Sequence, residues 1–78
     1  MTLGELYIDV NGNPAHNVFE KEKTVGVIYQ LENGLLEYMY SIGYTTFCGD
    51  CFETREEAAE YLVSAFKKQL LETARQLS

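Results

Sequence analysis

Apolar and polar residues alternate from residue 3 to residue 10, which is the period-two pattern of a strand with one buried face. The pattern predicts an N-terminal strand over residues 3–10, ended by the turn-forming segment 11–14. Residues 15–23 mix apolar and charged positions and are interpreted as a loop with room for a short strand. The aliphatic side of the predicted strand, which we expect to be packed, consists of Leu6, Ile8 and Val10, and the polar side of Glu5, Tyr7 and Asp9.

A hairpin formed by residues 24–31 and 35–44 is predicted by Asn33 and Gly34, the preferred pair for a two-residue type I′ turn. With that turn, Tyr29 lies opposite Tyr38 and Ile28 lies opposite Met39. Residues opposite each other share a face of the sheet. The predicted packed face therefore contains Val25, Val27, Tyr29, Leu31, Leu36, Tyr38, Tyr40 and Ile42. The opposite, outer face would show Ile28 and Met39 among polar residues that include Glu37.

A long helix is predicted for residues 54–77. Thr54 and Glu57 have the spacing of a capping box, in which each side chain accepts a hydrogen bond from the other's backbone amide. A helix of that length spans about 36 Å, whereas a strand of eight residues spans only about 27 Å. We therefore expect the second half of the helix to need cover from residues 15–23 or from another chain. Apolar residues recur at helical spacing at Ala59, Leu62, Val63, Phe66, Leu70, Ala74 and Leu77.

These elements predict one α+β domain over residues 1–78, in which an antiparallel sheet of about three strands carries one long C-terminal helix. A chain of 78 residues is near the size at which a single core supplies only about 3–5 kcal/mol of net stability. We therefore also expect a homodimer, formed through the C-terminal helix.

The charge balance narrows the class of partner. Twelve acidic and six basic residues give a net charge of -6, which opposes direct binding to nucleic acid or to an anionic membrane. The sequence has no apolar run long enough to span a bilayer and no signal-peptide pattern at its start, which predicts a cytoplasmic protein. A protein partner with a basic surface is the expectation that follows.

Cys48 and Cys51 form the one CxxC motif, and thiols at this spacing can bind a metal or form a disulfide. A structural zinc site needs four ligands, and His16 is the only histidine, so a complete thiolate site would need two chains. The predicted helix begins after both cysteines, unlike the redox motif of thioredoxin-like proteins. One alternative is a tight turn at Gly49 and Asp50 without metal, in which one or both cysteines are small buried apolar residues. A second is a zinc-linked homodimer, and a third is a redox enzyme, which would need thiols that react quickly at neutral pH.

Acidic residues before and within the first turns of the helix suggest a protein-binding surface. Part of this pattern reflects the helix macrodipole, which favours carboxylates at a helix N-terminus. The outer sheet face adds an apolar spot in a polar rim, which is typical of a protein interface. The predicted partner-binding residues are Asp50, Glu53, Glu56, Glu57 and Glu60 near the helix start, and Tyr7, Ile28, Glu37 and Met39 on the outer face.

These observations predict a small acidic binding protein, without enzymatic activity or cofactor, that occupies a basic surface of a nucleic-acid-handling partner. Spaced carboxylates can imitate the charge of a nucleic-acid backbone. In size and charge the chain is similar to phage-encoded inhibitors of host defence, including anti-CRISPR proteins, and this resemblance implies an inhibitor. The alternative is a metal-stabilised homodimer with a structural or regulatory role, using Cys48 and Cys51.

Overall fold

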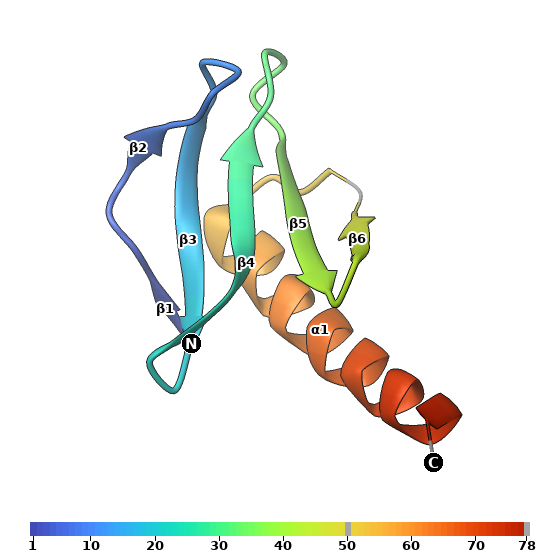
Figure 1. The fold of residues 1–78 in the computed structure, drawn as a ribbon. Coiled ribbons are helices and arrows are strands. Elements are labelled where there is room, and N and C mark those ends of the chain that lie inside the picture. Colours follow the sequence, from blue (N-terminus) through green and yellow to red (C-terminus); the bar gives the residue numbers. More distant parts are fainter. Residues whose placement is uncertain (50, 78) are drawn as a thin grey trace.

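The structure, a computed structural model, describes residues 1–49 and 51–77. It contains an antiparallel sheet with the strand order β1-β3-β4-β5-β6, and β2 also pairs with β3 (Figure 1). One helix packs across one face of that sheet, so the predicted α+β class is confirmed, whereas the sheet has more strands than the three predicted. The elements are β1 (Thr2–Leu3), β2 (Tyr7–Ile8), β3 (Pro14–Glu20), β4 (Lys23–Gln30), β5 (Leu36–Ile42), β6 (Thr45–Cys48) and α1 (Arg55–Leu77).

The central hairpin, β4 and β5, forms as predicted, but its loop is one residue longer. The Leu31 amide donates to the Leu35 carbonyl at 2.7 Å, and the Gly34 amide donates to the Leu31 carbonyl at 2.9 Å. Gly34 has a φ of 87°, so the loop is a type I turn followed by a left-handed residue rather than a two-residue type I′ turn. An Asn-Gly pair suits both loops, which is why the sequence did not distinguish them.

The longer loop shifts the register by one residue and reverses the faces of β4. Ile28 lies opposite Tyr38, and Tyr29 lies opposite Glu37. Ile28, predicted on the outer face, is fully buried in the core, so its assignment as a partner-binding residue is wrong. The predicted burial of Leu36, Tyr38 and Tyr40 is confirmed, but Val27 and Tyr29 pair with Met39 and Glu37 on the face away from α1.

Val25 is buried in spite of this shift. Val18 pairs with Gly26 and Phe19 pairs with Thr24, so Val25 has no partner in that ladder. Such a bulge lets two successive residues of one strand lie opposite one residue of the next. The bulge therefore returns Val25 to the core, where it is 9% exposed.

Residues 15–23, predicted as a loop with room for a short strand, contribute most of β3, so the larger part of this segment is strand. This strand pairs with β1 and β2 on one side and with β4 on the other. Its mixed composition follows from its place, because α1 packs mainly on β4 and β5 and leaves part of β3 uncovered. The turn to β4 consists of Lys21 and Glu22, with φ values of 51° and 68°.

The predicted strand 3–10 is divided into β1 and β2, which both pair with β3. Its aliphatic side is not packed: Leu6, Ile8 and Val10 are 58%, 63% and 101% exposed. The prediction that these side chains join the core is wrong, because α1 does not cover this edge of the sheet.

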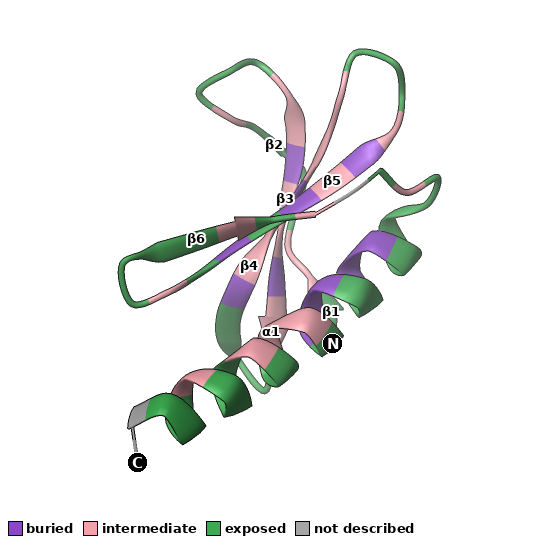
Figure 2. Ribbon diagram, turned by 90° about the vertical axis from the view of Figure 1, so that its right-hand side faces the viewer, coloured by how far each residue is buried: buried purple, intermediate pink, exposed green. Residues whose placement is uncertain are grey.

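Helix α1 begins next to the predicted capping residue. The Thr54 hydroxyl accepts a hydrogen bond from the Glu57 amide at 3.2 Å, which supplies one half of the capping box. One side of the first half of α1, formed by Ala58, Ala59, Leu62 and Val63, is buried against the sheet. The second half runs past the sheet with mainly exposed residues (Figures 1 and 2). The prediction that the helix outruns the sheet is confirmed, and Leu70 and Leu71 are 47% and 62% exposed.

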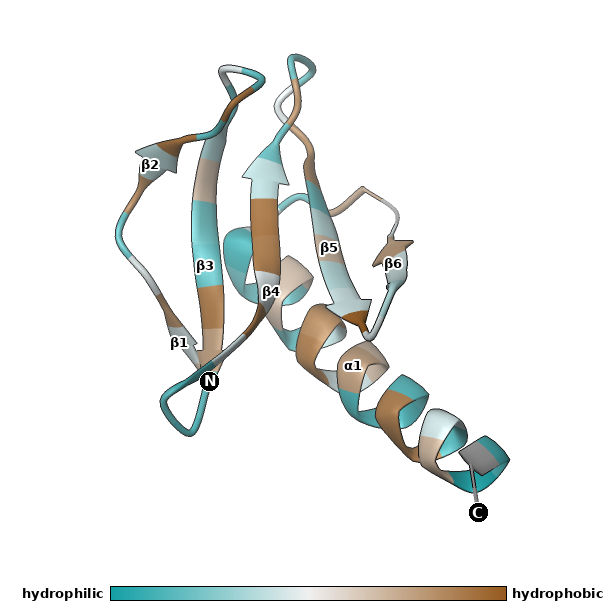
Figure 3. Ribbon diagram, in the orientation of Figure 1, coloured by the Kyte–Doolittle hydropathy of each residue, from teal (hydrophilic) through white to brown (hydrophobic). Residues whose placement is uncertain are grey.

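The core lies between α1 and the strands β4 and β5, where hydrophobic residues of the two layers meet (Figure 3). Aromatic rings extend it toward β6. The Tyr40 ring lies 5.1 Å from the Phe47 ring and 5.9 Å from the Phe66 ring, measured between centroids. Burial raises the pKa of Tyr40, as do the charges of Tyr61 and Glu72. The residues of the core are Val18, Val25, Ile28, Leu36, Tyr38, Tyr40, Ala58, Ala59, Leu62 and Val63.

Candidate functional site

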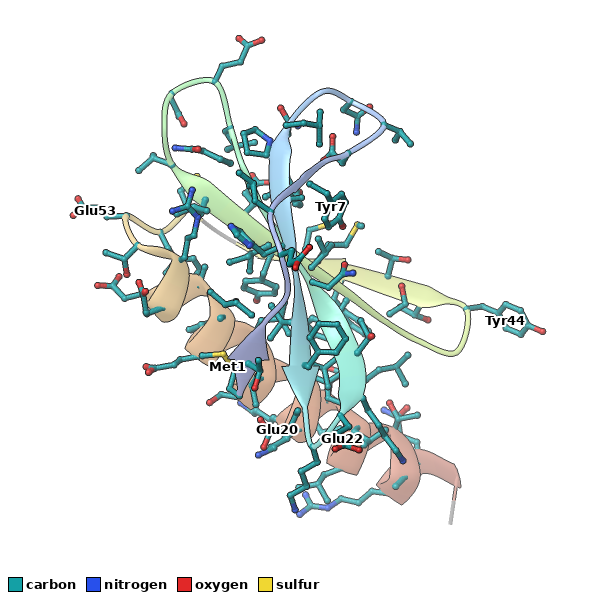
Figure 4. The ribbon with its side chains drawn as sticks, turned by 90° about the vertical axis from the view of Figure 1, so that its left-hand side faces the viewer. Met1, Tyr7, Glu20, Glu22, Tyr44 and Glu53 are labelled. Carbon is teal, nitrogen blue, oxygen red and sulfur yellow. The ribbon has the colours of Figure 1, made fainter. Side chains whose placement is uncertain are left out.

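The predicted partner-binding residues lie on two separate surfaces. Tyr7 lies on the side of the sheet away from α1 (Figure 4), and Glu37 and Met39 share that face by the register of β4 and β5. The second surface lies at the start of α1 and contains Glu53, Glu56, Glu57 and Glu60. Asp50 lies outside the described residues. The structure therefore does not bring the predicted residues together into one site.

The surface at the start of α1, here called the acidic helix start, consists of Glu53, Glu56, Glu57 and Glu60. All four side chains are exposed, and in the part of the chain that the structure describes none of them forms an ion pair. Glu53 and Glu56, together with Arg55, line a hollow of about 280 Å³, and Glu57 and Glu60 line another of about 340 Å³. The macrodipole favours carboxylates here, and their exposure leaves them free to meet a cationic partner.

The surface on the outer face contains a narrow slot. Tyr7, Ala15 and Tyr29 lie opposite one another on three neighbouring strands, β2, β3 and β4. Ala15 is fully buried, and its small side chain lies in the row between the two tyrosines. With strands about 4.8 Å apart, the two tyrosine backbones are roughly 10 Å apart. The resulting outer-face slot has a volume of about 230 Å³ and is lined by Tyr7, Asp9, Val10, Asn11, Val27, Tyr29 and Met39.

Hydrogen bonds fix the polar groups of the outer-face slot. The Tyr29 hydroxyl donates to Glu37 Oε1 at 2.6 Å, and the Tyr7 hydroxyl donates to Asn17 Oδ1 at 3.0 Å. Asp9 Oδ1 accepts from the amides of Asn11 and Asn13, each at 2.9 Å, so the loop holds this carboxylate in place.

The surroundings of Tyr29 favour its neutral, protonated form. Burial raises the pKa of Tyr29 most, followed by the hydrogen bond to Glu37 and by the charges of Glu37, Cys48 and Asp9. These groups come from β5, β6 and the loop after β2, which the sheet brings around one phenol. The outer-face slot is therefore an apolar and aromatic site with an acidic rim.

The two cysteines lie where β6 leaves β5. Cys48 pairs with Met39, and Phe52 pairs with Leu36, so the connection between them makes a bulge. Gly49 is required there, because a Cβ atom at this position would lie 1.8 Å from the Tyr38 ring. Both thiols are free and exposed, so they are not the small buried residues that the tight-turn alternative includes. They line a hollow of about 310 Å³ together with Tyr38 and Tyr61.

No group of three or more metal-binding side chains occurs among residues 1–49 and 51–77. His16, which the sequence placed in a loop, belongs to β3, and its Nδ1 atom donates to the Gly4 carbonyl at 2.9 Å. A metal site that uses Cys48 and Cys51 would therefore draw further ligands from outside the described part of this chain.

Sequence analysis missed Asp9, Val27 and Tyr29 as site residues. Asp9 was assigned only to the polar side of the first strand, while Val27 and Tyr29 were assigned to the core because of the register error. Asp9 followed by Asn11 and Gly12 is a turn signal. From it, a carboxylate that accepts hydrogen bonds from the following backbone amides could have been predicted. No pattern in the sequence brings the loop after β2 next to β4.

Comparisons with known proteins give no relatives. No family model matches the chain, and no curated protein or solved structure matches it either. Within the described residues, no helix combines the length and the apolar character needed to cross a membrane.

Proposed function

We propose that this chain is a small acidic protein-binding module that inhibits its partner by occupying a basic, nucleic-acid-handling surface. The observation that carries this proposal is the acidic helix start, whose four exposed carboxylates have no ion-pair partner among the described residues. Together with the net charge of -6, they would steer the module toward a cationic groove.

The outer face supplies the apolar part of the proposed contact. Tyr7 and Met39 are 39% and 37% exposed, and Glu37 and Asp9 stand beside them. Tyrosine and methionine are enriched at protein interfaces, where an apolar centre within a polar rim excludes water. Ile28 takes no part in this proposal, because it is buried.

We propose a binding role rather than an enzymatic one. The hollows on the described surface, including those beside the cysteines, the acidic helix start and the outer face, have volumes between about 230 and 380 Å³. Small-molecule sites usually occupy about 300–1,000 Å³, so these hollows stand at or below the lower end of that range.

The test is a kinetic measurement with the partner captured from the native host. We expect the association rate to fall at least about tenfold between 50 and 500 mM salt, because steering by exposed charges is screened. The triple variant Glu53→Gln, Glu57→Gln, Glu60→Gln should lose most of this salt dependence. The matched triple variant Glu5→Gln, Glu22→Gln, Glu32→Gln removes three exposed carboxylates elsewhere and should not. If binding is tight and the association rate changes neither with salt nor in the first triple variant, the proposed steering is contradicted.

A second candidate is a metal-linked homodimer with a structural or regulatory role. The observation that favours it is the exposure of both thiols, which leaves Cys48 and Cys51 accessible to a second copy. Two chains would supply four thiolates, the ligand set of a structural zinc site. The exposed Leu70 and Leu71 of α1 would add apolar contacts between the two copies.

Metal analysis and molecular mass in solution test this candidate together. The homodimer requires about half a zinc per chain, and Cys51→Ser should remove both the zinc and the dimer. A monomer without metal, purified under reducing conditions with zinc present, would contradict it.

A further inference from the structure

We propose that the outer-face slot binds the side chain of an arginine on the partner protein. This inference rests on the proposed function, because it names the group that a basic partner would insert. It is carried by the position of Tyr7, Tyr29 and Asp9 around one small opening.

The size of the slot suits one long side chain. Its volume is about 230 Å³, below the range of sites that hold a cofactor or a drug-sized ligand. Ala15, in the row between Tyr7 and Tyr29, is fully buried and does not line the slot, whose walls are the side chains around it.

The walls match the two parts of an arginine side chain. Val10, Val27 and Met39 offer apolar surface for the methylene stem, which covers such surface readily. Tyr7 and Tyr29 offer aromatic rings, and a guanidinium group near a tyrosine ring gains a cation–π interaction.

The acidic rim selects a cation. Asp9 Oδ1 is held by two backbone amides, while Asp9 Oδ2 accepts no hydrogen bond from the described part of the chain. That oxygen is available to a guanidinium donor, and a charge-assisted hydrogen bond of this kind is stronger than a neutral one. Glu37 lies on the far side of Tyr29, so an anion entering the slot would meet like charge from two directions.

Arginine fits this set of groups better than lysine does. Its guanidinium is planar, stacks on aromatic rings and is more weakly hydrated than an ammonium. A lysine would lose more hydration on entering the slot and would gain less from the two rings. The structure thus assigns the slot to a guanidinium group.

The experiment titrates the isotope-labelled full chain with an acetylated and amidated glycine–serine peptide that carries one arginine. Two matched peptides carry citrulline, which has the same shape without the charge, or lysine. We expect saturable NMR shifts at Val27, Tyr29 and Met39 with the arginine peptide, binding at least about threefold weaker with lysine, and no saturable shifts with citrulline. Equal binding of the citrulline or the lysine peptide would overturn the assignment.

Variants locate the site. Asp9→Asn keeps the oxygen that accepts the loop amides but removes the charge, and Tyr7→Ala removes one ring. Each should weaken binding of the arginine peptide about threefold to tenfold. The matched controls Glu32→Gln and Tyr44→Ala remove an exposed carboxylate and an exposed tyrosine elsewhere and should leave the affinity unchanged.

The outcomes separate this inference from the proposed function. If the peptide shifts lie at residues 53–60 and Tyr7→Ala has no effect, the slot assignment fails while a basic partner remains supported. If binding to the captured partner is independent of salt, the proposed steering function fails, regardless of whether the arginine peptide binds the slot. Absence of peptide binding at millimolar concentration in low salt would overturn the slot assignment alone.

Discussion

At the scale of single residues, Tyr29 shows how one register position changes the role of a side chain. The predicted register placed Tyr29 opposite Tyr38 in the core, whereas the structure places it opposite Glu37 on the outer face. There its hydroxyl donates to the Glu37 carboxylate at 2.6 Å. Both the burial of the phenol and this bond favour its neutral form, and its pKa is raised accordingly.

The pKa of Tyr29 predicts a loss of stability at alkaline pH. Its contribution is fully present below the ordinary tyrosine pKa of 10.0 and is lost as the pH rises above it, because the unfolded chain then releases the proton first. Tyr29→Phe should therefore make the free energy of unfolding less dependent on pH above about 10. Urea unfolding of both proteins between pH 8 and 11 measures this. Curves of unfolding free energy against pH that run parallel for the two proteins would contradict this prediction. The raised pKa of Tyr40 accounts for the pH dependence that remains in the variant.

At the scale of elements, the helix was predicted well and the strands less well. Helix α1 was predicted over residues 54–77 and is found at Arg55–Leu77, because its apolar spacing and its Thr54 cap are local signals. The strand β6 was missed, although Gly43 and Tyr44 form the two-residue loop that returns the chain from Ile42 to Thr45. The strand β3 is longer than the short strand that the prediction for residues 15–23 allowed, because its mixed composition resembles that of a loop.

The turn between β3 and β4 predicts a stabilising substitution. Lys21 and Glu22 both have positive φ, in the left-handed region that costs side-chain-bearing residues about 1–2 kcal/mol each. Lys21→Asn with Glu22→Gly introduces the pair that a type I′ turn prefers and should raise the free energy of unfolding by about 1 kcal/mol.

Chemical denaturation measures this effect as a higher midpoint at an unchanged slope. The control Lys21→Gln with Glu22→Gln removes the same charges and keeps the unfavourable backbone, so it should stay within about 0.5 kcal/mol of the parent protein. A control as stable as the first variant would show that charge, not backbone conformation, is responsible.

At the scale of the whole molecule, one carboxylate connects three distant parts of the chain. Glu20, at the end of β3, lies 3.4 Å from the N-terminal ammonium and 3.7 Å from Lys67 of α1. Its hydrogen bond with the N-terminal ammonium is the main cause that lowers the pKa of Glu20, with a further contribution from the charge of Lys67. The ion pair gives the second half of α1 one contact with the sheet.

The lowered pKa of Glu20 predicts an acid-sensitive contribution to stability. The contribution is present above the ordinary pKa of 4.5 and is lost as the pH falls through the lower folded value. Glu20→Gln should reduce the difference in stability between pH 7 and pH 3, and Lys67→Gln should reduce it less. Thermal unfolding across this range measures both, and an equal effect of the two variants would contradict the leading role of the N-terminus.

The sequence allowed several residues of the candidate site to be identified, but not their arrangement in space. Tyr7, Glu37 and Met39 were identified on the outer face, and the structure gives them that face. The slot itself depends on Asp9 and Val10 lying next to Val27 and Tyr29, which are far apart in the sequence. The two segments approach each other because both pair with β3, which sequence analysis expected at most as a short strand within a loop.

The sequence by itself determined the α+β class, the capped helix and the packed side of β5, because these follow from spacings within a few residues of each other. Tertiary structure decided the length of the β4–β5 loop, and with it the burial of Ile28 and the exposure of Tyr29. The local cost of a two-residue or a three-residue loop around Asn33 and Gly34 is similar. Packing beneath α1 selects the register, because only one choice fills the core with Ile28.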